Sequence, residues 1–167
     1  NMILFWVFVV IVFAFGFVVL FGAPYVPSLR KEVRSAFKEL YPLGSKDVLV
    51  DLGSGDGVVL LEAARRGAKA YGYELNPLLV LVSKLRVGKR ATVRLVNMWN
   101  TKLPDDTTIV YMFSVTRDSK KSIRYLQAEA TRLGRPFSVM MLGAGLKGLP
   151  VRASYRGHTL YEIEPGK

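Results

Sequence analysis

Two different hydrophobic patterns divide the chain. Residues 2–23 form one apolar run without a charged side chain, whereas apolar positions beyond residue 28 alternate with polar ones at helical and strand spacings. A helix through the run would rise about 1.5 Å per residue and would reach across roughly 30 Å, the thickness of a hydrocarbon core. We therefore expect residues 1–23 to be a transmembrane anchor and residues 24–167 to be a separate domain.

A cleaved signal peptide and a buried core helix are the alternatives for this apolar run. A signal peptide has basic residues before a shorter apolar stretch, but no basic residue precedes Arg30 here. The first charges after the run are mostly cationic, with Arg30, Lys31 and Arg34 close together. By the positive-inside rule, we expect a single-pass membrane protein whose domain lies on the cytoplasmic side.

Beyond the anchor, the hydrophobic periodicity predicts helices and strands that alternate along the chain. Pro24 and Pro27 form a collar after the anchor, and Ser28 and Ser119 are expected to cap helices. Two alternating runs around Arg156 and Gly157 predict an antiparallel hairpin at the end. The pattern is that of an α/β fold with a doubly wound, mostly parallel sheet, whose ligand should lie at the carboxyl ends of the central strands. Helices are expected at 29–41, 57–66, 77–87 and 119–133, and strands at 47–52, 68–74, 92–96, 107–113 and 137–142.

A glycine turn flanked by two acidic residues is the clearest sign of a ligand site. In "VLVDLGSGDG", Gly53 and Gly55 allow a tight turn and a close approach of the backbone to a ligand. Asp51 ends the strand before the turn, where a carboxylate attracts a cation or an amino group. Glu74 ends the next strand, where a carboxylate can accept hydrogen bonds from both hydroxyls of a ribose.

A dinucleotide is the alternative ligand, because a glycine turn with a distal acid is also typical of NAD sites. The NAD pattern is G-x-G-x-x-G, and here Gly57 comes one residue early. Asp56 would repel a pyrophosphate at the N-terminus of the following helix. A nucleoside that carries an amino-acid tail and a positive sulfonium fits the acidic turn better.

At this point the stretch "VLVDLGSGDG" resembles the first motif of the seven-strand S-adenosylmethionine-dependent methyltransferases. With "APYVPS", "GYELNPLLV" and "NMWNTKLPD", the chain resembles more closely the membrane-anchored protein-lysine methyltransferases that modify the adenine nucleotide translocase and the ATP synthase c-subunit, and their prokaryotic relatives. The resemblance extends from Ala23 to about Val115. It implies a Rossmann-like, seven-stranded sheet, S-adenosylmethionine as the cofactor, and a lysine of a membrane protein as the methyl acceptor.

The resemblance also implies roles for individual residues. Asp51 and the glycines of the turn would surround the methionine part of the cofactor, and Glu74 would hold the ribose. Asn97 stands where the family usually has an acid that bonds the adenine amino group, and an amide oxygen can accept the same bond. For Tyr25, closure over the cofactor and a simple role at the helix entry are both open. The full set of expected cofactor-binding residues is Asp51, Gly53, Gly55, Asp56, Gly57, Glu74, Asn76, Asn97, Met98 and Tyr25.

Methyl transfer to an amine needs an aligned neutral nucleophile and the exclusion of water more than it needs a strong base. Phe113 and Ser114, at the end of the fourth strand, are the candidates for lining the acceptor channel, with ordinary strand-end packing as the alternative. The chain lacks the Asn/Asp-Pro-Pro-aromatic motif of enzymes that methylate amino groups of nucleic acids, and it has no cysteine for cytosine C5 chemistry. We therefore do not expect nucleic acid as the substrate.

The charge of the chain leaves several partners open. Lys and Arg number 24 against 13 Asp and Glu, for a net charge of +11. Anionic lipid, nucleic acid or a solvated surface without a partner could each explain the excess, and tethering to a membrane favours lipid. His158 has no second ligand near it in sequence, so no metal site is expected. The alternatives for function are methylation of a lipid, a quinone, another small molecule or RNA, and a non-catalytic scaffold of the same fold.

Overall fold

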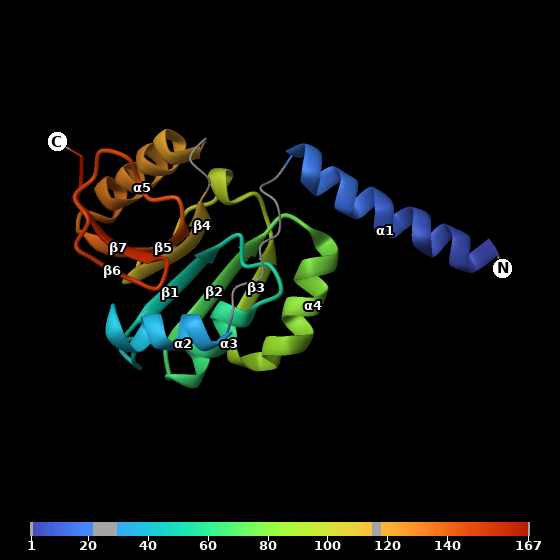
Figure 1. Cartoon of the computed structure of the whole chain (residues 1–167), viewed down its shortest axis with the longest axis horizontal. Coiled ribbons are helices and arrows are strands. Elements are labelled where there is room, and N and C mark those ends of the chain that lie inside the picture. Colours follow the sequence, from blue (N-terminus) through green and yellow to red (C-terminus); the bar gives the residue numbers. More distant parts are fainter. Residues whose placement is uncertain (1, 22–29, 115–117, 167) are drawn as a thin grey trace.

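A computed structural model describes residues 2–21, 30–114 and 118–166 of the chain (Figure 1). An apolar N-terminal helix projects from a domain in which helices and strands alternate. The elements in order are α1 (Met2–Phe21), α2 (Arg30–Glu39), β1 (Val48–Leu52), α3 (Val58–Arg65), β2 (Lys69–Glu74), α4 (Pro77–Val87), the 3-10 turn η1 (Gly88–Arg90), β3 (Thr92–Leu95), the 3-10 turn η2 (Met98–Asn100), β4 (Ile109–Ser114), α5 (Ser119–Leu133), β5 (Phe137–Gly143), β6 (Ala153–Tyr155) and β7 (His158–Ile163).

The strands form one seven-stranded sheet with the order β3-β2-β1-β4-β5-β7-β6. Strands β1 to β5 run parallel to one another, and β7 is antiparallel to both β5 and β6. The strand order reverses between β1 and β4, which is the switch point where ligands bind in open α/β sheets. The expected doubly wound, mostly parallel sheet with an antiparallel hairpin is confirmed.

A hydrophobic core covers each face of the sheet. On one face, Phe37 of α2 and Leu60 of α3 pack with the strand residues Leu49 and Tyr111. On the other face, Leu126 of α5 belongs to the second core. Because both faces are covered, the central strands are apolar on both sides, as in other parallel sheets.

The predicted hairpin turn is confirmed, whereas one of the two predicted helix caps is wrong and the other lies outside the described residues. Arg156 and Gly157 both have positive φ, 46° and 77°, as expected for the two central residues of a tight hairpin turn. The expected capping role of Ser119 is wrong, because α5 has Asp118 at its N-cap and Ser119 in its first turn. The Ser119 hydroxyl instead accepts a hydrogen bond from the backbone N–H of Lys147 at 3.0 Å. Ser28, the other expected cap, lies outside the described residues.

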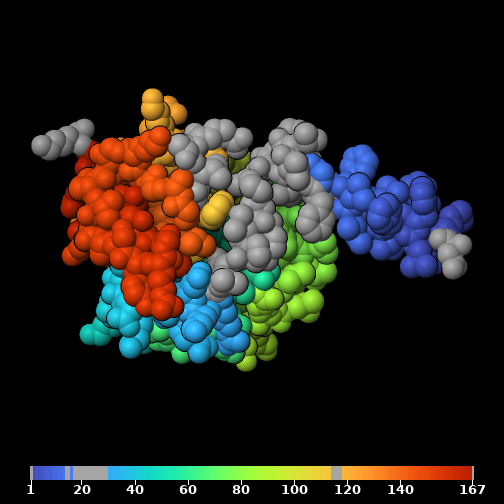
Figure 2. Space-filling view, viewed as in Figure 1, coloured from blue at the N-terminus to red at the C-terminus, as the bar shows by residue number. Residues whose placement is uncertain are grey.

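The helix α1 stands apart from the packed domain, as the space-filling view also shows (Figure 2). Its large hydrophobic side chains from Met2 to Phe13 are mostly exposed. In the described part of the chain, no helix combines the length and the apolarity needed to cross a membrane. The proline collar with Tyr25 lies outside the described residues.

Candidate functional site

The turn after β1 folds back over the end of β2. The backbone N–H groups of Gly53 and Ser54 donate to the carbonyl oxygen of Tyr73 at 2.8 and 3.0 Å. Gly53, Gly55 and Gly57 have φ values of 86°, 51° and 80°, a left-handed conformation that favours glycine. The turn is thereby fixed at the carboxyl edge of the sheet, next to the switch point.

Glu74 ties the two strand ends together. One carboxylate oxygen accepts the N–H of Gly55 at 2.8 Å, and the other accepts the N–H groups of Leu75 and Asn76, each at 2.8 Å. The side chain is buried, and the three backbone donors hold its carboxylate in one position at the strand end. A carboxylate has about four acceptor directions, so one remains for a hydroxyl of a ligand.

Asp51 occupies a different electrostatic environment on the neighbouring strand. Its side chain is 3 % exposed, and burial, followed by the negative charges of Glu74 and Asp56, raises the pKa of this carboxyl well above its usual range. A bound cation would offset the cost of ionising Asp51 at this position. The chain as a whole is strongly basic, so this acidic turn is an exception to its surroundings.

Asp56 connects the turn to α4. One oxygen forms an ion pair with Arg86, and the other accepts the N–H of Val58 at 3.3 Å. Asp56 therefore supports the first turn of α3 and the contact between the glycine turn and α4.

Asn76 caps α4 from a fully buried position. Its side-chain oxygen accepts the N–H groups of Leu78 and Leu79 at 2.9 and 3.4 Å. The amide nitrogen of Asn76 and the hydroxyl oxygens of Ser54 and Ser83 have no hydrogen-bond partner among the described residues. Ser54 lies in the turn itself, yet the sequence did not identify it, because a serine within a glycine turn has no distinctive spacing.

Asn97 and Met98 lie beyond the end of β3, where an adenine group would be expected. Asn97 is exposed, and its side-chain oxygen accepts the N–H of Trp99 at 3.1 Å, which starts the turn η2. Met98 is partly buried. The site has these two side chains at one end and the Asp51 and Glu74 carboxylates along its strand ends.

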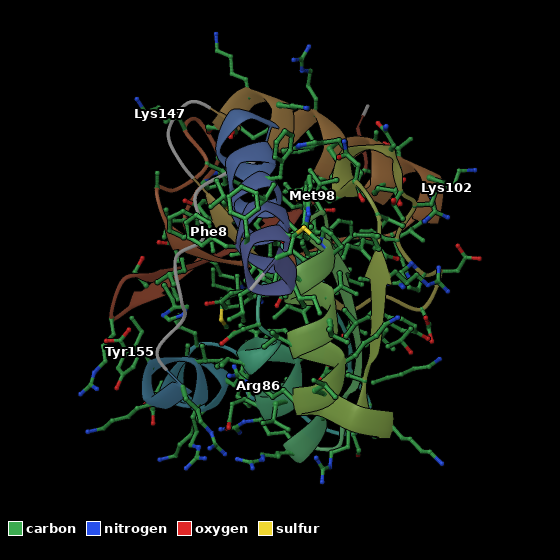
Figure 3. All side chains as sticks on the ribbon, turned by 90° about the vertical axis from the view of Figure 1, so that its right-hand side faces the viewer. Phe8, Arg86, Met98, Lys102, Lys147 and Tyr155 are labelled. Atoms are coloured by element: carbon green, nitrogen blue, oxygen red, sulfur yellow. The ribbon has the colours of Figure 1, made fainter. Side chains whose placement is uncertain are left out.

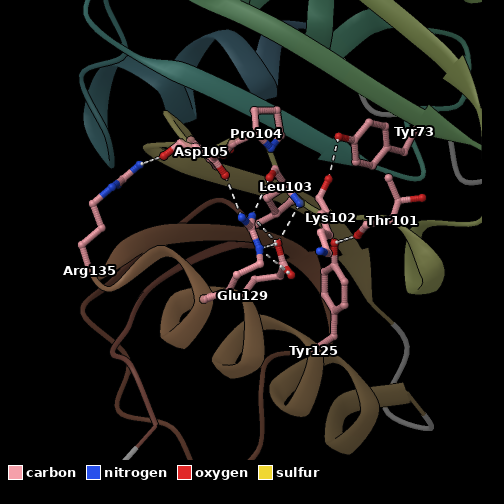
Figure 4. Close-up of polar contacts among 11 residues, drawn as sticks. Tyr73, Thr101, Lys102, Leu103, Pro104, Asp105, Tyr125, Glu129 and Arg135 are labelled. Atoms are coloured by element: carbon pink, nitrogen blue, oxygen red, sulfur yellow. Dashed lines mark hydrogen bonds and ion pairs between the residues drawn. The ribbon is translucent and has the colours of Figure 1, made fainter.

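The loop that follows η2 is held by contacts to β2 and α5 (Figure 4). The hydroxyls of Tyr73 and Tyr125 donate to the carbonyls of Lys102 and Thr101 at 3.2 and 2.7 Å. Glu129 accepts the N–H of Leu103 at 2.7 Å. These bonds fix the chain directly after Asn97 and Met98, so their place at the sheet edge depends on α5.

Curated proteins with similar sequences are lysine methyltransferases. The ATP synthase c-subunit lysine N-methyltransferase of Xenopus laevis is 44 % identical over 63 residues, which cover 38 % of this chain and 27 % of that protein. The adenine nucleotide translocase lysine N-methyltransferase of Mus musculus is 39 % identical over 88 residues, 49 % of this chain and 38 % of that protein. A protein-lysine N-methyltransferase of Saccharolobus islandicus is 33 % identical over 100 residues, 56 % of this chain and 61 % of that protein. The chain is related to these lysine methyltransferases.

Solved structures of methyltransferases share the fold. An RNA methyltransferase from Salinibacter ruber, solved with S-adenosyl-L-homocysteine, has a TM-score of 0.73 and 22 % identity, over 85 % of this chain and 95 % of that one. A magnesium protoporphyrin IX methyltransferase from Synechocystis, solved with S-adenosylmethionine, has a TM-score of 0.59 and 13 % identity, over 90 % and 89 % of the two chains. No family model matches the chain. The methyltransferase fold is shown, and the chain spans less than two thirds of the length of the curated relatives it matches.

The expected acceptor residues of this methyltransferase fold lie at the end of β4. Phe113 is partly buried and pairs with Leu142 of β5, and Ser114 pairs with Gly143. The position of Tyr25 lies outside the described residues, so the structure does not place it in the site. Among the residues that are described, no group of three or more His, Cys, Asp or Glu side chains could hold a metal ion.

A buried tyrosine–histidine pair next to this position was not identified from the sequence. The Tyr111 hydroxyl lies 2.9 Å from Nε2 of His158, and Nδ1 of His158 lies 3.3 Å from the carbonyl oxygen of Arg156. Nδ1 therefore donates to the carbonyl, and Nε2 accepts from the tyrosine. Burial lowers the pKa of His158, so the ring is neutral at physiological pH. Tyr111 pairs in register with Asp51, which places the pair beside the acidic turn.

Proposed function

We propose that the chain is an S-adenosylmethionine-dependent protein-lysine N-methyltransferase. The observation that carries the proposal is the pair of carboxylates at neighbouring strand ends, with Glu74 fixed by three backbone N–H groups and Asp51 buried beside the glycine turn. The lysine methyltransferases related in sequence support the protein substrate.

The residues present fit this cofactor. The remaining acceptor direction of Glu74 suits a ribose hydroxyl, and the acidic turn suits the cationic end of the molecule. Asn97 and Met98 would border the adenine. When bound, S-adenosylmethionine supplies a methyl group on a positive sulfur. That chemistry would convert a neutral amine into a methylated ammonium with a neutral thioether as the leaving group, and the ammonium proton would pass to solvent.

For the acceptor, Phe113 and Ser114 are the residues that we propose to line the channel. They end β4, which lies next to β1 in the sheet and therefore next to the glycine turn. Their task would be to align the lysine with the sulfonium and to exclude water, which are the main requirements for this displacement.

We also propose that α1 attaches the enzyme to a membrane, with the domain on the cytoplasmic side and a membrane-protein lysine as the substrate. The apolar composition of Met2–Phe21 and the exposure of its side chains up to Phe13 support this attachment. Attachment would restrict the enzyme to substrates at the membrane surface and raise their effective concentration.

Isothermal titration calorimetry with S-adenosylmethionine tests the cofactor site. We expect binding by the wild-type chain and at least a tenfold weaker affinity for Glu74→Ala, about 1.4 kcal/mol or more. Glu162→Ala is the matched control, because Glu162 is an exposed strand residue paired only with Arg152 among the described residues. Absence of binding by the wild type would instead support a non-catalytic scaffold.

Mass spectrometry with isotopically labelled cofactor tests the acceptor. We expect the label on lysine of membrane proteins from cells that contain the enzyme, and its loss with Glu74→Ala. Label confined to lipid, a quinone or RNA would overturn the protein substrate while leaving the cofactor site intact.

A further inference from the structure

The outer face of α4 is apolar, although it faces solvent. The helix buries Leu79, Val80, Ser83 and Val87 against the domain. On the other side, Leu81, Val82 and Leu85 are 55 %, 37 % and 77 % exposed. A surface helix normally has polar residues on its outer side. An exposed apolar patch on a folded domain indicates a surface that contacts a protein, a ligand or a membrane.

The edge strand β3, which lies beside α4, also exposes an apolar side chain. Val93 of β3 is buried in the core on the α4 side of the sheet. Because side chains alternate along a strand, Leu95 points to that same side, and it is 54 % exposed. We define the α4 face as Leu81, Val82, Leu85 and Leu95.

Three cations adjoin the α4 face, Lys84 within α4 and Lys89 and Arg90 in the turn η1 that follows it. The 30 residues from Leu75 to Pro104 contain no Asp or Glu. Lys84, Lys89 and Arg90 form no ion pair within the described residues. Arg86 of the same helix is paired with Asp56, and Arg94 points to the opposite side of β3 from Leu95.

Exposed leucines within a group of unpaired cations match the surface of an anionic bilayer. The leucines can enter the boundary between headgroups and acyl chains, and the cations can contact the headgroups. A second copy of the chain fits less well, because the same basic segment would face itself across a symmetric contact. Single-stranded RNA is bound through stacking aromatic side chains, and the α4 face has none.

The position of α4 agrees with a lipid partner. Figure 1 shows α4 at the edge of the domain from which α1 projects, and Figure 3, seen from that side, has both helices in front. An apolar α1 in lipid would therefore hold the α4 face close to the headgroups. The helix also starts at Asn76, directly after Glu74, so the surface adjoins the cofactor turn.

We propose that the α4 face docks on anionic lipid and orients the domain on the membrane surface. The docking does not require methyl transfer, so it can fail or succeed independently of the proposed activity. Docking through α4 holds the carboxyl edge of the sheet at a fixed height above the bilayer, where a lysine of a membrane protein would be presented.

Site-specific fluorescence in vesicles tests the proposal, because the chain has no native cysteine. The full chain carries a single label at Leu85→Cys, or at Ser154→Cys as the control. Ser154 is exposed on β6, at the opposite edge of the sheet from β3. With phosphatidylserine vesicles that contain a lipid-attached quencher, we expect several-fold stronger quenching at position 85 than at position 154.

Charge reversal gives a second readout that does not alter the apolar residues. Lys89→Glu with Arg90→Glu should reduce the quenching at position 85 several-fold, as should vesicles of phosphatidylcholine alone or high salt. Equal quenching at positions 85 and 154 would overturn the proposal. It would also be overturned if the label at position 85 were shielded without vesicles, by another copy of the chain or by RNA.

Discussion

At the scale of single residues, the two carboxylates of the site differ in their surroundings. Glu74 receives three backbone N–H groups, whereas Asp51 is buried next to other acids. Glu74 is therefore held by hydrogen bonds, whereas the charge of Asp51 has no such support and depends on what binds beside it. Binding of a cation should favour the ionised form of Asp51 and release a proton.

We expect Asp51→Asn to stabilise the ligand-free protein at neutral pH by several degrees in Tm and to weaken cofactor binding. Burial and the neighbouring acids raise the pKa of Asp51 in the folded state. Between the ordinary pKa and the raised one, the folded state binds more protons than the unfolded state, so stability falls as pH rises through that window. Thermal unfolding from pH 4 to pH 8 should show this slope in the wild type and less of it in Asp51→Asn. Identical slopes in the wild type and the variant would contradict a raised pKa of Asp51.

The glycine at position 57 carries a packing constraint as well as a backbone constraint. A Cβ there would lie 2.3 Å from the Ser83 hydroxyl, whereas a Cβ at Gly134 would meet nothing within 4 Å, and both glycines have the left-handed α conformation. We expect Gly134→Ala to cost about 1 kcal/mol from backbone strain, and Gly57→Ala to cost about 1–2 kcal/mol more from overpacking. Urea unfolding measures the loss of stability in both variants. Ser83→Ala should recover part of the extra cost in Gly57→Ala, and equal costs at the two glycines would refute the packing argument.

At the scale of elements, one carboxylate joins α2 to α3. Glu62 of α3 is 2 % exposed and forms ion pairs with Arg30 and Arg34 of α2 and with Arg65. The α2 helix starts directly after the undescribed residues 22–29, so this contact fixes the first described element of the domain after α1.

We expect Glu62→Gln to destabilise the domain by about 2 kcal/mol at pH 7, less than for a fully buried ion pair because the arginines are about half exposed. Burial opposes ionisation of Glu62, but the hydrogen bonds from Arg30 and Arg34 prevail and lower its pKa. Its contribution is therefore present above the ordinary pKa and is lost as pH falls through the lowered one. Urea midpoints should differ between variant and wild type at pH 7 and converge in acid. Glu39→Gln, whose partner Lys38 is exposed, should change little.

Elements with strong local signals could be predicted from the sequence, and contacts between elements could not. The bounds of α4 follow from Pro77 in its first turn, and those of α5 from Gly134 at its end. The sequence predicts the cap of α5 at Ser119, one residue after the N-cap Asp118 of the structure, because both residue types are good caps. The Tyr111–His158 bond joins residues 47 positions apart, and no spacing along the chain encodes such a pair.

The same contrast holds for the candidate site: its local features could be predicted from the sequence, and its contacts between segments could not. The turn and the acid at each strand end were identified from the sequence, because glycine spacing and strand ends are local features. The hydrogen bond from the Gly55 N–H to Glu74 depends on how the glycine turn packs against the end of β2. The same packing leaves the Ser54 hydroxyl without a hydrogen-bond partner among the described residues. The support of the Asn97 loop by α5 is also a tertiary contact, between segments about 26 residues apart.

At the scale of the whole molecule, charge and apolar surface are distributed unevenly. The acidic groups of the turn lie within a chain of net charge +11, and the segment after Glu74 is free of acidic residues for 30 positions. The acidic turn attracts a cationic cofactor, and the basic residues of the rest of the chain attract anions. This arrangement suits an enzyme that works next to a negative surface.

The helix α1 should act on the whole enzyme as a tether. If it acts by proximity, deleting residues 1–21 should reduce methylation of a membrane substrate by about 10²-fold or more, because the effective concentration is lost. Methylation of a soluble peptide with the same lysine should change little, since the site residues described all lie beyond α1. Replacing α1 by an unrelated apolar helix should restore the membrane reaction. Rescue would show that the helix supplies position rather than recognition, and failure of the unrelated helix to restore activity would mean that α1 itself contacts the substrate.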